Sequence, residues 1–193
     1  LVRAVKFLED TVSGYLDVPY SDYEEKLEAI KDFDVDNRFR LLRKLCFAVN
    51  SLEDAFGENS KYSASFIELW GKVAAVGKNL VNLKTAVPDM DFSSPSRATI
   101  MGHIGLVKQL FQRSADKYRE QYELYTHKVQ DFRAAVIFLQ ALRRLHVVLS
   151  ERDEAETLKR KIEIWSTKLE ADLKKAEQAK KASASSRVLA AFD

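Results

Sequence analysis

The sequence predicts an all-α protein, built as an elongated antiparallel coiled coil of three long helices and preceded by one or two short helices. Two observations carry this prediction. The chain has only six glycines and three prolines in 193 residues, too few turn formers for an all-β sandwich or barrel. Its apolar residues also recur in heptads along most of its length, as they do in coiled coils.

The first 33 residues are expected to form short helices that link to the main domain. Apolar residues at spacings of three and four, from Leu1 to Tyr15, predict an amphipathic helix that ends before Pro19. Its polar face carries fewer cations than a membrane-surface helix usually has, so we expect it to lie against the body of the protein. Ser21 is an N-cap candidate for a second short helix that runs to about Phe33.

The first long helix is predicted over residues 36–86, because the apolar residues there share one strict heptad frame. The segment Gly57-Glu-Asn-Ser60 has the composition of a loop, but Asn59 and Ser63 hold frame positions and the register continues. Two prolines between residues 88 and 95 then end the helix. The apolar frame positions are Leu42, Leu45, Val49, Leu52, Phe56, Phe66, Trp70, Val73 and Leu80.

The second long helix is predicted to begin near Ser96 and to continue to a polar turn at residues 150–154. Its seam alternates steps of four and three as far as Leu139 and then shifts face near residue 142. A shift of this kind indicates a bend or a change of packing partner. The seam residues are Tyr118, Tyr122, Tyr125, Val129, Phe132, Val136 and Leu139.

The third long helix carries a heptad seam from Leu158 to Ala176 and is predicted to reach about Ala182, with a short apolar helical stretch after Arg187. Residues 34–193 are therefore predicted to form one three-helix domain. The first two helices would each be about 75–80 Å long, so the monomer must be elongated. Pairing of two chains side by side would cover the apolar residues that lie outside the seams.

Charge and composition narrow the partners and the compartment. Residues 1–95 carry 12 Lys/Arg against 16 Asp/Glu, whereas residues 96–193 carry 19 against 13. This split fits a basic face that meets an anionic partner, although long helices also carry solvated charges without any partner. No apolar run approaches the roughly 20 residues that a bilayer span needs, and a single cysteine cannot form an internal disulfide. We therefore expect a soluble, cytoplasmic protein.

Several stretches resemble the BAR domains of sorting nexins. Leu110-Phe-Gln-Arg-Ser-Ala-Asp-Lys-Tyr-Arg-Glu-Gln-Tyr122 and Ala155-Glu-Thr-Leu-Lys-Arg-Lys-Ile-Glu-Ile-Trp165 resemble the second and third helices of that family, and Arg187-Val-Leu-Ala-Ala-Phe192 resembles its closing turns. The segment from Phe66 to Leu80, with Trp70 and Gly77, resembles the aromatic and small-residue step of the first helix. The resemblance covers about residues 36–192, with a longer segment at 87–95 and an earlier end to the third helix than is usual in the family.

The resemblance implies a membrane-curvature sensing or scaffolding module that acts in endosomal tubulation and trafficking. In such a module a crescent-shaped dimer binds anionic, phosphoinositide-containing membrane through its basic concave face, and no cofactor takes part. The implied partner is a second copy or another BAR protein, and the implied location is the cytoplasmic face of endosomes. A PX domain commonly precedes the BAR domain; residues 1–33 would sit where the linker to it belongs, and a start without Met fits a piece of a longer protein.

Two sets of site residues follow from these expectations. Cations near the distal end of the rod are expected to bind membrane, although each could equally be a solvated charge; they are Arg133, Arg143, Arg144, Arg152, Lys159, Arg160 and Lys161. Aromatic residues of the first two long helices are expected at the dimer interface; they are Phe47, Phe66, Trp70, Phe111 and Tyr118.

The sequence offers no constellation for an enzyme, a metal site or a nucleic-acid partner. His103, His127 and His146 are too far apart for a helical i, i+4 metal pair, and Cys46 lies among apolar residues with no partnering histidine. The tyrosines of the second seam could stack on nucleic acid, but their heptad spacing favours core packing. The alternative function is a helical protein-interaction scaffold, such as a spectrin-like or tethering-complex segment, that binds no lipid.

Overall fold

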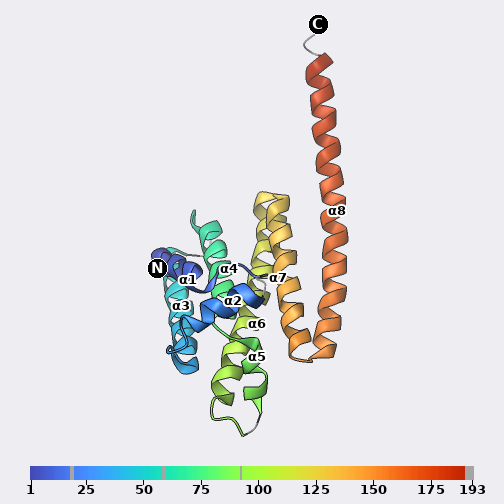
Figure 1. Ribbon diagram of the computed structural model, residues 1–193. Helices are drawn as coiled ribbons and strands as arrows, with labels where there is room; N and C mark the ends of the chain where they lie inside the picture. The colour runs from blue at the N-terminus through green and yellow to red at the C-terminus, as the bar shows by residue number, and fades with distance from the viewer. Residues whose placement is uncertain (18–19, 58–59, 92, 190–193) are drawn as a thin grey trace.

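The computed structural model is helical in all the regular elements that it describes, which confirms the all-α class (Figure 1). It describes residues 1–17, 20–57, 60–91 and 93–189, and the side chains of these residues except 20–22, 85, 89, 176–177 and 179–189. In chain order the elements are α1 (Val2–Val12), α2 (Tyr20–Glu28), α3 (Val35–Phe56), α4 (Ser63–Asn79), α5 (Leu83–Ala86), the 3-10 turn η1 (Pro88–Met90), α6 (Arg97–Glu120), the π-helical turn η2 (Gln121–Thr126), α7 (Val129–Val148) and α8 (Arg152–Leu189).

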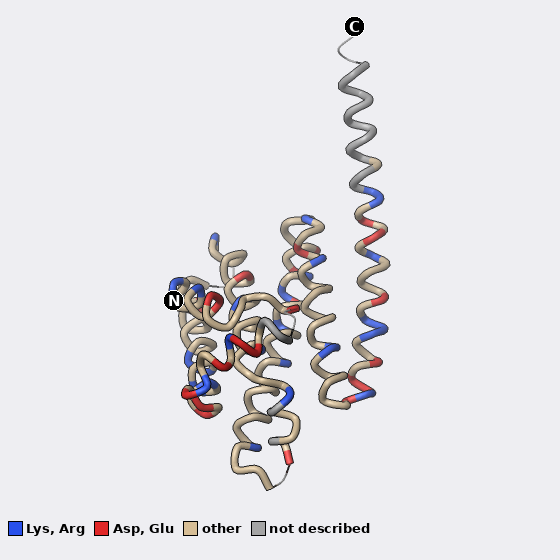
Figure 2. Tube along the Cα trace, viewed as in Figure 1, with Lys and Arg blue, Asp and Glu red and all other residues tan. Residues whose placement is uncertain are grey.

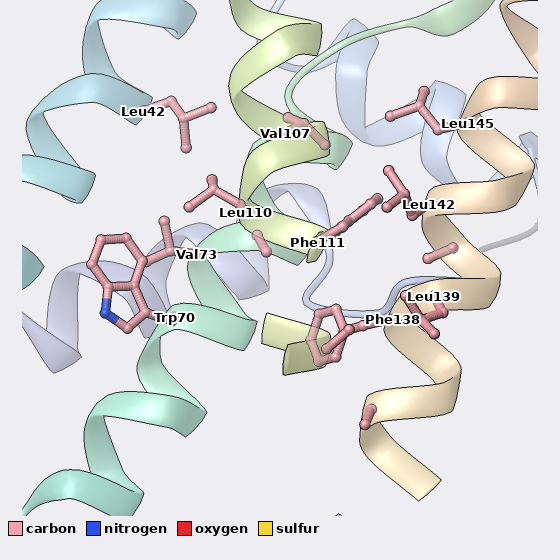
Figure 3. Close-up of a cluster of buried hydrophobic side chains, with 14 of the residues drawn as sticks. Leu42, Trp70, Val73, Val107, Leu110, Phe111, Phe138, Leu139, Leu142 and Leu145 are labelled. Carbon is pink, nitrogen blue, oxygen red and sulfur yellow. The ribbon is translucent and has the colours of Figure 1, made fainter. Parts of the chain in front are cut away.

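The helices lie in a series across the molecule. α1 and α3 stand at one side, α4, α6 and α7 follow, and α8 stands at the other side (Figure 1). One cluster of buried apolar side chains joins α1, α3, α4, α6, α7 and α8. The middle of this cluster is shown in Figure 3, where Trp70 and Val73 of α4 meet Leu110 of α6, and Phe111 of α6 faces Leu142 of α7.

The N-terminal helices are attached to this body by buried contacts. Val12 of α1 is buried in a small cluster with residues of α4. Asn79, the last residue of α4, donates hydrogen bonds from Nδ2 to the carbonyl oxygens of Ser13 and Tyr15, at 2.8 and 3.0 Å. The expectation that the first helix lies on the body is confirmed, whereas the domain boundary between residues 33 and 34 stays a prediction.

The single helix expected over residues 36–86 is wrong, because the chain turns back after α3. Gly57 follows the last residue of α3 with a φ of 83°, in the left-handed region that glycine adopts at helix ends. α4 then runs antiparallel to α3: Trp70 contacts Glu53, and Gly77 lies against Leu42. The heptad frame marks buried residues in both helices, such as Leu42 of α3 and Val73 of α4, whereas its positions next to the turn, Leu52 and Phe56, are exposed.

A polar contact on this hairpin fixes its position against α6. The carboxylate of Glu53 accepts hydrogen bonds from Trp70 Nε1 at 2.9 Å and from Arg113 Nη2 at 2.8 Å. The Arg113 guanidinium lies 3.9 Å from the centroid of the Trp70 indole ring, which is within cation–π range. One acid of α3 therefore ties α3, α4 and α6 together.

The helix expected from Ser96 to about residue 149 is also wrong, because it is a hairpin of α6 and α7. After η2, His127 takes a left-handed conformation with a φ of 50°, and the chain reverses. The ring of Tyr118 then stacks on Phe138 with centroids 5.7 Å apart, and Tyr122 stacks on Phe132 at 5.0 Å. The seam residues Tyr122 and Phe132 thus face each other across the hairpin, whereas the seam residue Tyr125 is exposed.

The third long helix is confirmed as α8, which begins at Arg152 and continues to Leu189. It follows the turn at residues 149–151, where Ser150 has a φ of 61°. The apolar stretch expected after Arg187 falls within α8 up to Leu189, and residues 190–193 lie outside the described part of the chain. Among the helices that the structure describes, none is long and apolar enough to cross a bilayer.

Two glycines provide a matched test of the packing around α4. A Cβ at Gly77 would lie 2.9 Å from Cδ1 of the fully buried Leu42, whereas a Cβ at Gly105 of α6 would meet nothing within 4 Å. Gly105→Ala should raise the free energy of unfolding by about 0.5–1 kcal/mol through helix propensity. Gly77→Ala should lower it by about 1 kcal/mol or more through overpacking. Urea unfolding of both variants measures the difference, and equal stabilisation by both would contradict this packing.

Acid should destabilise the protein through His103. Its ring is fully buried, Nε2 lies 2.8 Å from the carbonyl oxygen of Gly77, and burial lowers its pKa from 6.5 to about 4. The unfolded chain therefore takes up a proton between these two pH values that the folded chain does not. Stability should fall by about 1.4 kcal/mol per pH unit across this window, in addition to other groups.

The substitution His103→Gln isolates this contribution. The amide can still donate to Gly77, but it does not titrate, so the dependence of the unfolding free energy on pH should become shallower by about one proton. Urea titrations at several pH values within the window provide the measurement. If wild type and variant show the same pH dependence, the histidine is not the group responsible.

Candidate interaction surface

α8 is held against the α6–α7 hairpin by a short apolar seam. Ala155, Leu158 and Trp165 are buried, and the Trp165 ring centroid lies 5.7 Å from that of Phe132 in α7. These residues recur at helical spacing, which is why the seam was visible in the sequence. The first half of α8 is thus part of the core.

Cations from two helices cover the indole of Trp165. The Arg119 guanidinium of α6 and the Lys161 ammonium of α8 lie 5.2 and 4.9 Å from the ring centroid. Lys161 also pairs with Asp116 of α6 at 3.5 Å. Both cations therefore act within the chain, at the junction of α6 and α8.

The seam ends in a polar contact at the tip of the hairpin. The Tyr122 hydroxyl donates to Asp172 Oδ2 at 2.7 Å, and burial together with this bond raises the pKa of Tyr122 to about 12. Lys168 Nζ donates to Glu123 Oε1 at 2.7 Å, and this bond lowers the pKa of Glu123. Among the residues of α8 whose side chains the structure describes, Asp172 is the last that makes a hydrogen bond, an ion pair or a ring contact.

α8 continues past this point and beyond the tip of the hairpin (Figure 1). Residues 173–189 would span about 25 Å at 1.5 Å per residue. We call this stretch the projecting segment. Lys174 and Lys175, at its start, are exposed.

The two parts of α8 differ in their charge balance. Residues 152–172 carry five Lys/Arg against six Asp/Glu, and both signs are mixed along the helix (Figure 2). The sequence of the projecting segment carries five Lys/Arg against one Glu. The positive surplus of α8 therefore lies beyond the part that packs on the body.

The cations predicted to bind membrane lie on α7 and on the first part of α8. Several have acidic partners: Arg144 pairs with Asp17 at 3.8 Å, and Lys159 and Arg160 approach Glu156 at 3.8 and 3.9 Å. The others are distributed along α7 and at the start of α8. Of these, Arg133 and Arg152 are exposed, Arg143 is half-buried, and Lys161 lies against Trp165.

Three of the five residues expected at a dimer interface lie instead in the core of the single chain. Phe66, Trp70 and Phe111 are buried, because α3, α4 and α6 pack on one another instead of forming rods. Tyr118 is half-buried and stacks on Phe138. Only Phe47 of the five is exposed, with 74% of its surface accessible.

The titratable residues singled out in the sequence take up separate positions. His146 Nδ1 lies 2.6 Å from Glu151, which Lys108 also contacts. His103 of α6 is buried against Gly77 of α4, and His127 lies in the turn of the α6–α7 hairpin. Burial raises the pKa of the Cys46 thiol to about 11, which disfavours the nucleophilic thiolate. Among the described residues, no cluster of histidine, cysteine and carboxylate side chains could hold a metal ion.

Sequence reasoning missed the contact of Tyr122 and Glu123 with Asp172 and Lys168. Tyr122 was expected in a seam, and only its apolar ring could be anticipated from the heptad spacing. No sequence signal indicated that η2 reverses the chain. The surplus of lysine after residue 172 was visible in the sequence, but only the end of the packing at Asp172 shows that this surplus lies on a projecting stretch.

A comparison with known protein families assigns the chain to one of them. The family model described as the TP0443 family matches residues 1–173. The chain belongs to the TP0443 family. The match covers α1 to α7 and the packed part of α8, and it ends one residue after Asp172. No curated protein and no solved structure matches this TP0443-family chain.

Neighbouring residues of α8 test how it docks. Trp165→Ala should lower the free energy of unfolding by about 3–5 kcal/mol, because a buried indole and its contacts are lost. Ile164→Ala, one position earlier and 69% exposed, should change it by less than about 0.5 kcal/mol. Chemical denaturation of both variants gives the comparison. Similar losses at the two positions would mean that α8 does not pack through Trp165.

Proposed function

We propose that this protein is a helical module that binds an anionic membrane surface through the projecting segment of α8. The observation that carries the proposal is that α8 extends past its packing partners, and that this length holds the positive surplus of the helix. A lysine or arginine near an anionic leaflet contributes about 1 kcal/mol of binding free energy. Five of them on one segment are sufficient for reversible attachment at low salt.

The shape of the molecule supports this arrangement. An isolated helix of this length is only marginally stable in water, so the segment gains from contact with a surface. Because it projects beyond the hairpin tip, it can approach a flat or curved leaflet without a clash from the body (Figure 1).

A crescent-shaped BAR-like dimer, sensing of curvature and an endosomal location stay predictions. A BAR dimer needs long rods, and here α3 with α4 and α6 with α7 form hairpins, so the helix lengths of the single chain give it little support. Membrane attachment through α8 does not require the crescent. Small-angle scattering with mass determination tests the dimer, which should exceed about 100 Å in length if its rods follow the helix rise.

Charge reversal at two places on α8 tests the membrane proposal. The double variant Lys174→Glu with Lys175→Glu changes the exposed start of the projecting segment. The control, Lys159→Glu with Arg160→Glu, changes the net charge equally within the packed part, beside Glu156. In co-sedimentation with phosphatidylserine-containing vesicles, the first variant should bind about tenfold or more weakly than wild type, and the control should bind nearly as wild type does.

Vesicles of neutral phosphatidylcholine and of several diameters complete the experiment. Wild type should bind the anionic vesicles and release them as salt is raised, because the attraction is screened. Equal binding to neutral vesicles, or equal loss in both variants, contradicts a role for the projecting segment. If wild type ignores anionic vesicles altogether, the protein-interaction scaffold is the better reading of the fold.

A further inference from the structure

A cleft lies where the end of α4 meets α2, α5 and the last turns of α7. Its main hollow, of about 480 Å³, is lined by Tyr23, Lys78, Leu83, Val87, Pro88 and Val148, together with Lys84. It continues into a smaller hollow of about 170 Å³ beside Phe111 and Arg144. Lys78, Leu83 and Val148 line both, so the two form one elongated space.

The walls of this cleft are aliphatic and aromatic, but one end is cationic. Lys78 and Arg144 both line the smaller hollow, and Asp17 is the acid beside them. Arg144 Nη2 lies 3.8 Å from Asp17 Oδ1, a loose ion pair with Asp17 mostly exposed. Among the described side chains that line the smaller hollow, two cations therefore stand against one carboxylate, and positive charge is in excess.

Lys78 is the better placed of the two cations to receive an anion. Its Nζ lies 4.9 Å from the centroid of the Tyr23 ring, and the Tyr23 hydroxyl is fixed by a bond to the carbonyl oxygen of Val81. Within the described part of the chain, no hydrogen bond from Nζ to an oxygen is observed. Burial and the nearby Arg144 lower the pKa of Lys78, so its charge is incompletely compensated.

Helix electrostatics account for only part of this arrangement. Lys78 lies in the last turn of α4, where a cation is favoured by the helix dipole. Arg144, however, comes from α7 and adds a second positive charge that opposes Lys78. Like charges brought together beside an apolar hollow are stabilised when an anion binds between them.

We propose that this cleft binds a small amphipathic anion, an aliphatic carboxylate, whose head group meets Lys78 and Arg144. Its hydrocarbon chain lies along Leu83, Val87 and Val148. Among the described lining residues, the two aromatic side chains, Tyr23 and Phe111, line different hollows, and the uncharged remainder is largely aliphatic, so an aliphatic body is the best match. This inference concerns a site separate from α8 and does not depend on the proposed function.

Calorimetric titration with decanoate tests the cleft, with decanol as the neutral match. Wild type should bind decanoate with a millimolar or lower Kd and decanol at least tenfold more weakly. Lys78→Met keeps most of the aliphatic stem and removes the charge, so decanoate binding should weaken about tenfold or more. Lys72→Met, on the same helix but paired with Glu68 outside the cleft, is the control and should bind as wild type does.

Three results would overturn the proposal. These are decanol binding as tight as decanoate binding, decanoate affinity unchanged in Lys78→Met, and equal loss in Lys72→Met. Thermal unfolding without ligand shows whether each variant is folded, and Arg144→Met provides a second removal of charge if Lys78→Met is unstable. Anionic vesicles separate a free carboxylate from a membrane lipid: Lys78→Met should bind them as wild type does, and a parallel loss would assign the cleft to membrane lipid instead.

Discussion

The burial of most of the surface of α4 is the constraint on which the rest of the fold depends. Eleven of its 17 residues are buried, so its solvated face, which carries the Glu68–Lys72 ion pair, is narrow and the rest of the helix needs neighbours. α1, α3 and α6 supply them, and Gly71 and Gly77 allow Phe138 and Leu42 to approach closely. A rod over residues 36–86 would have left much of this surface in water, at a cost of about 25 cal/mol for each Å². Folding back at Gly57 is the way this sequence avoids that cost.

The sequence predicts composition-dependent features well and chain direction poorly. The all-α class, the place of α8 and the packing of the first helix follow from turn content and apolar spacing, and the structure has them. The two hairpins were not predicted, because a heptad frame shows which face of a helix is buried and not where the chain reverses. At the first hairpin the continuous frame outweighed the loop composition of residues 57–60. Each reversal includes a described residue with positive φ, Gly57 in the first and His127 in the second. A histidine in that conformation gives no signal in the sequence.

The candidate interaction surface, too, could be predicted from the sequence only in part. Lysine and arginine positions can be read directly, but whether a cation is free depends on contacts made across the fold. Lys161 and Arg119 lie over Trp165, and Lys168 bonds to Glu123, so these charges are used in holding α8 to the hairpin. The end of that holding at Asp172 appears only in the structure. The lysines after it are therefore a different set from those that the sequence pattern favoured.

The two parts of α8 meet opposing physical demands. The part of α8 that packs beside Arg119 needs balanced charge, because a surplus of lysine and arginine there would repel the Arg119 guanidinium. Residues 152–172 have that balance. A helix that attaches to an anionic leaflet needs a surplus and also needs freedom from intramolecular acids, which would neutralise it. One continuous helix meets both demands only if the helices that it packs against end at the point where its charge balance becomes positive. The contacts of Tyr122 and Glu123 with α8 place that end at Asp172, so the packing that stabilises the body also sets how much of α8 extends beyond it.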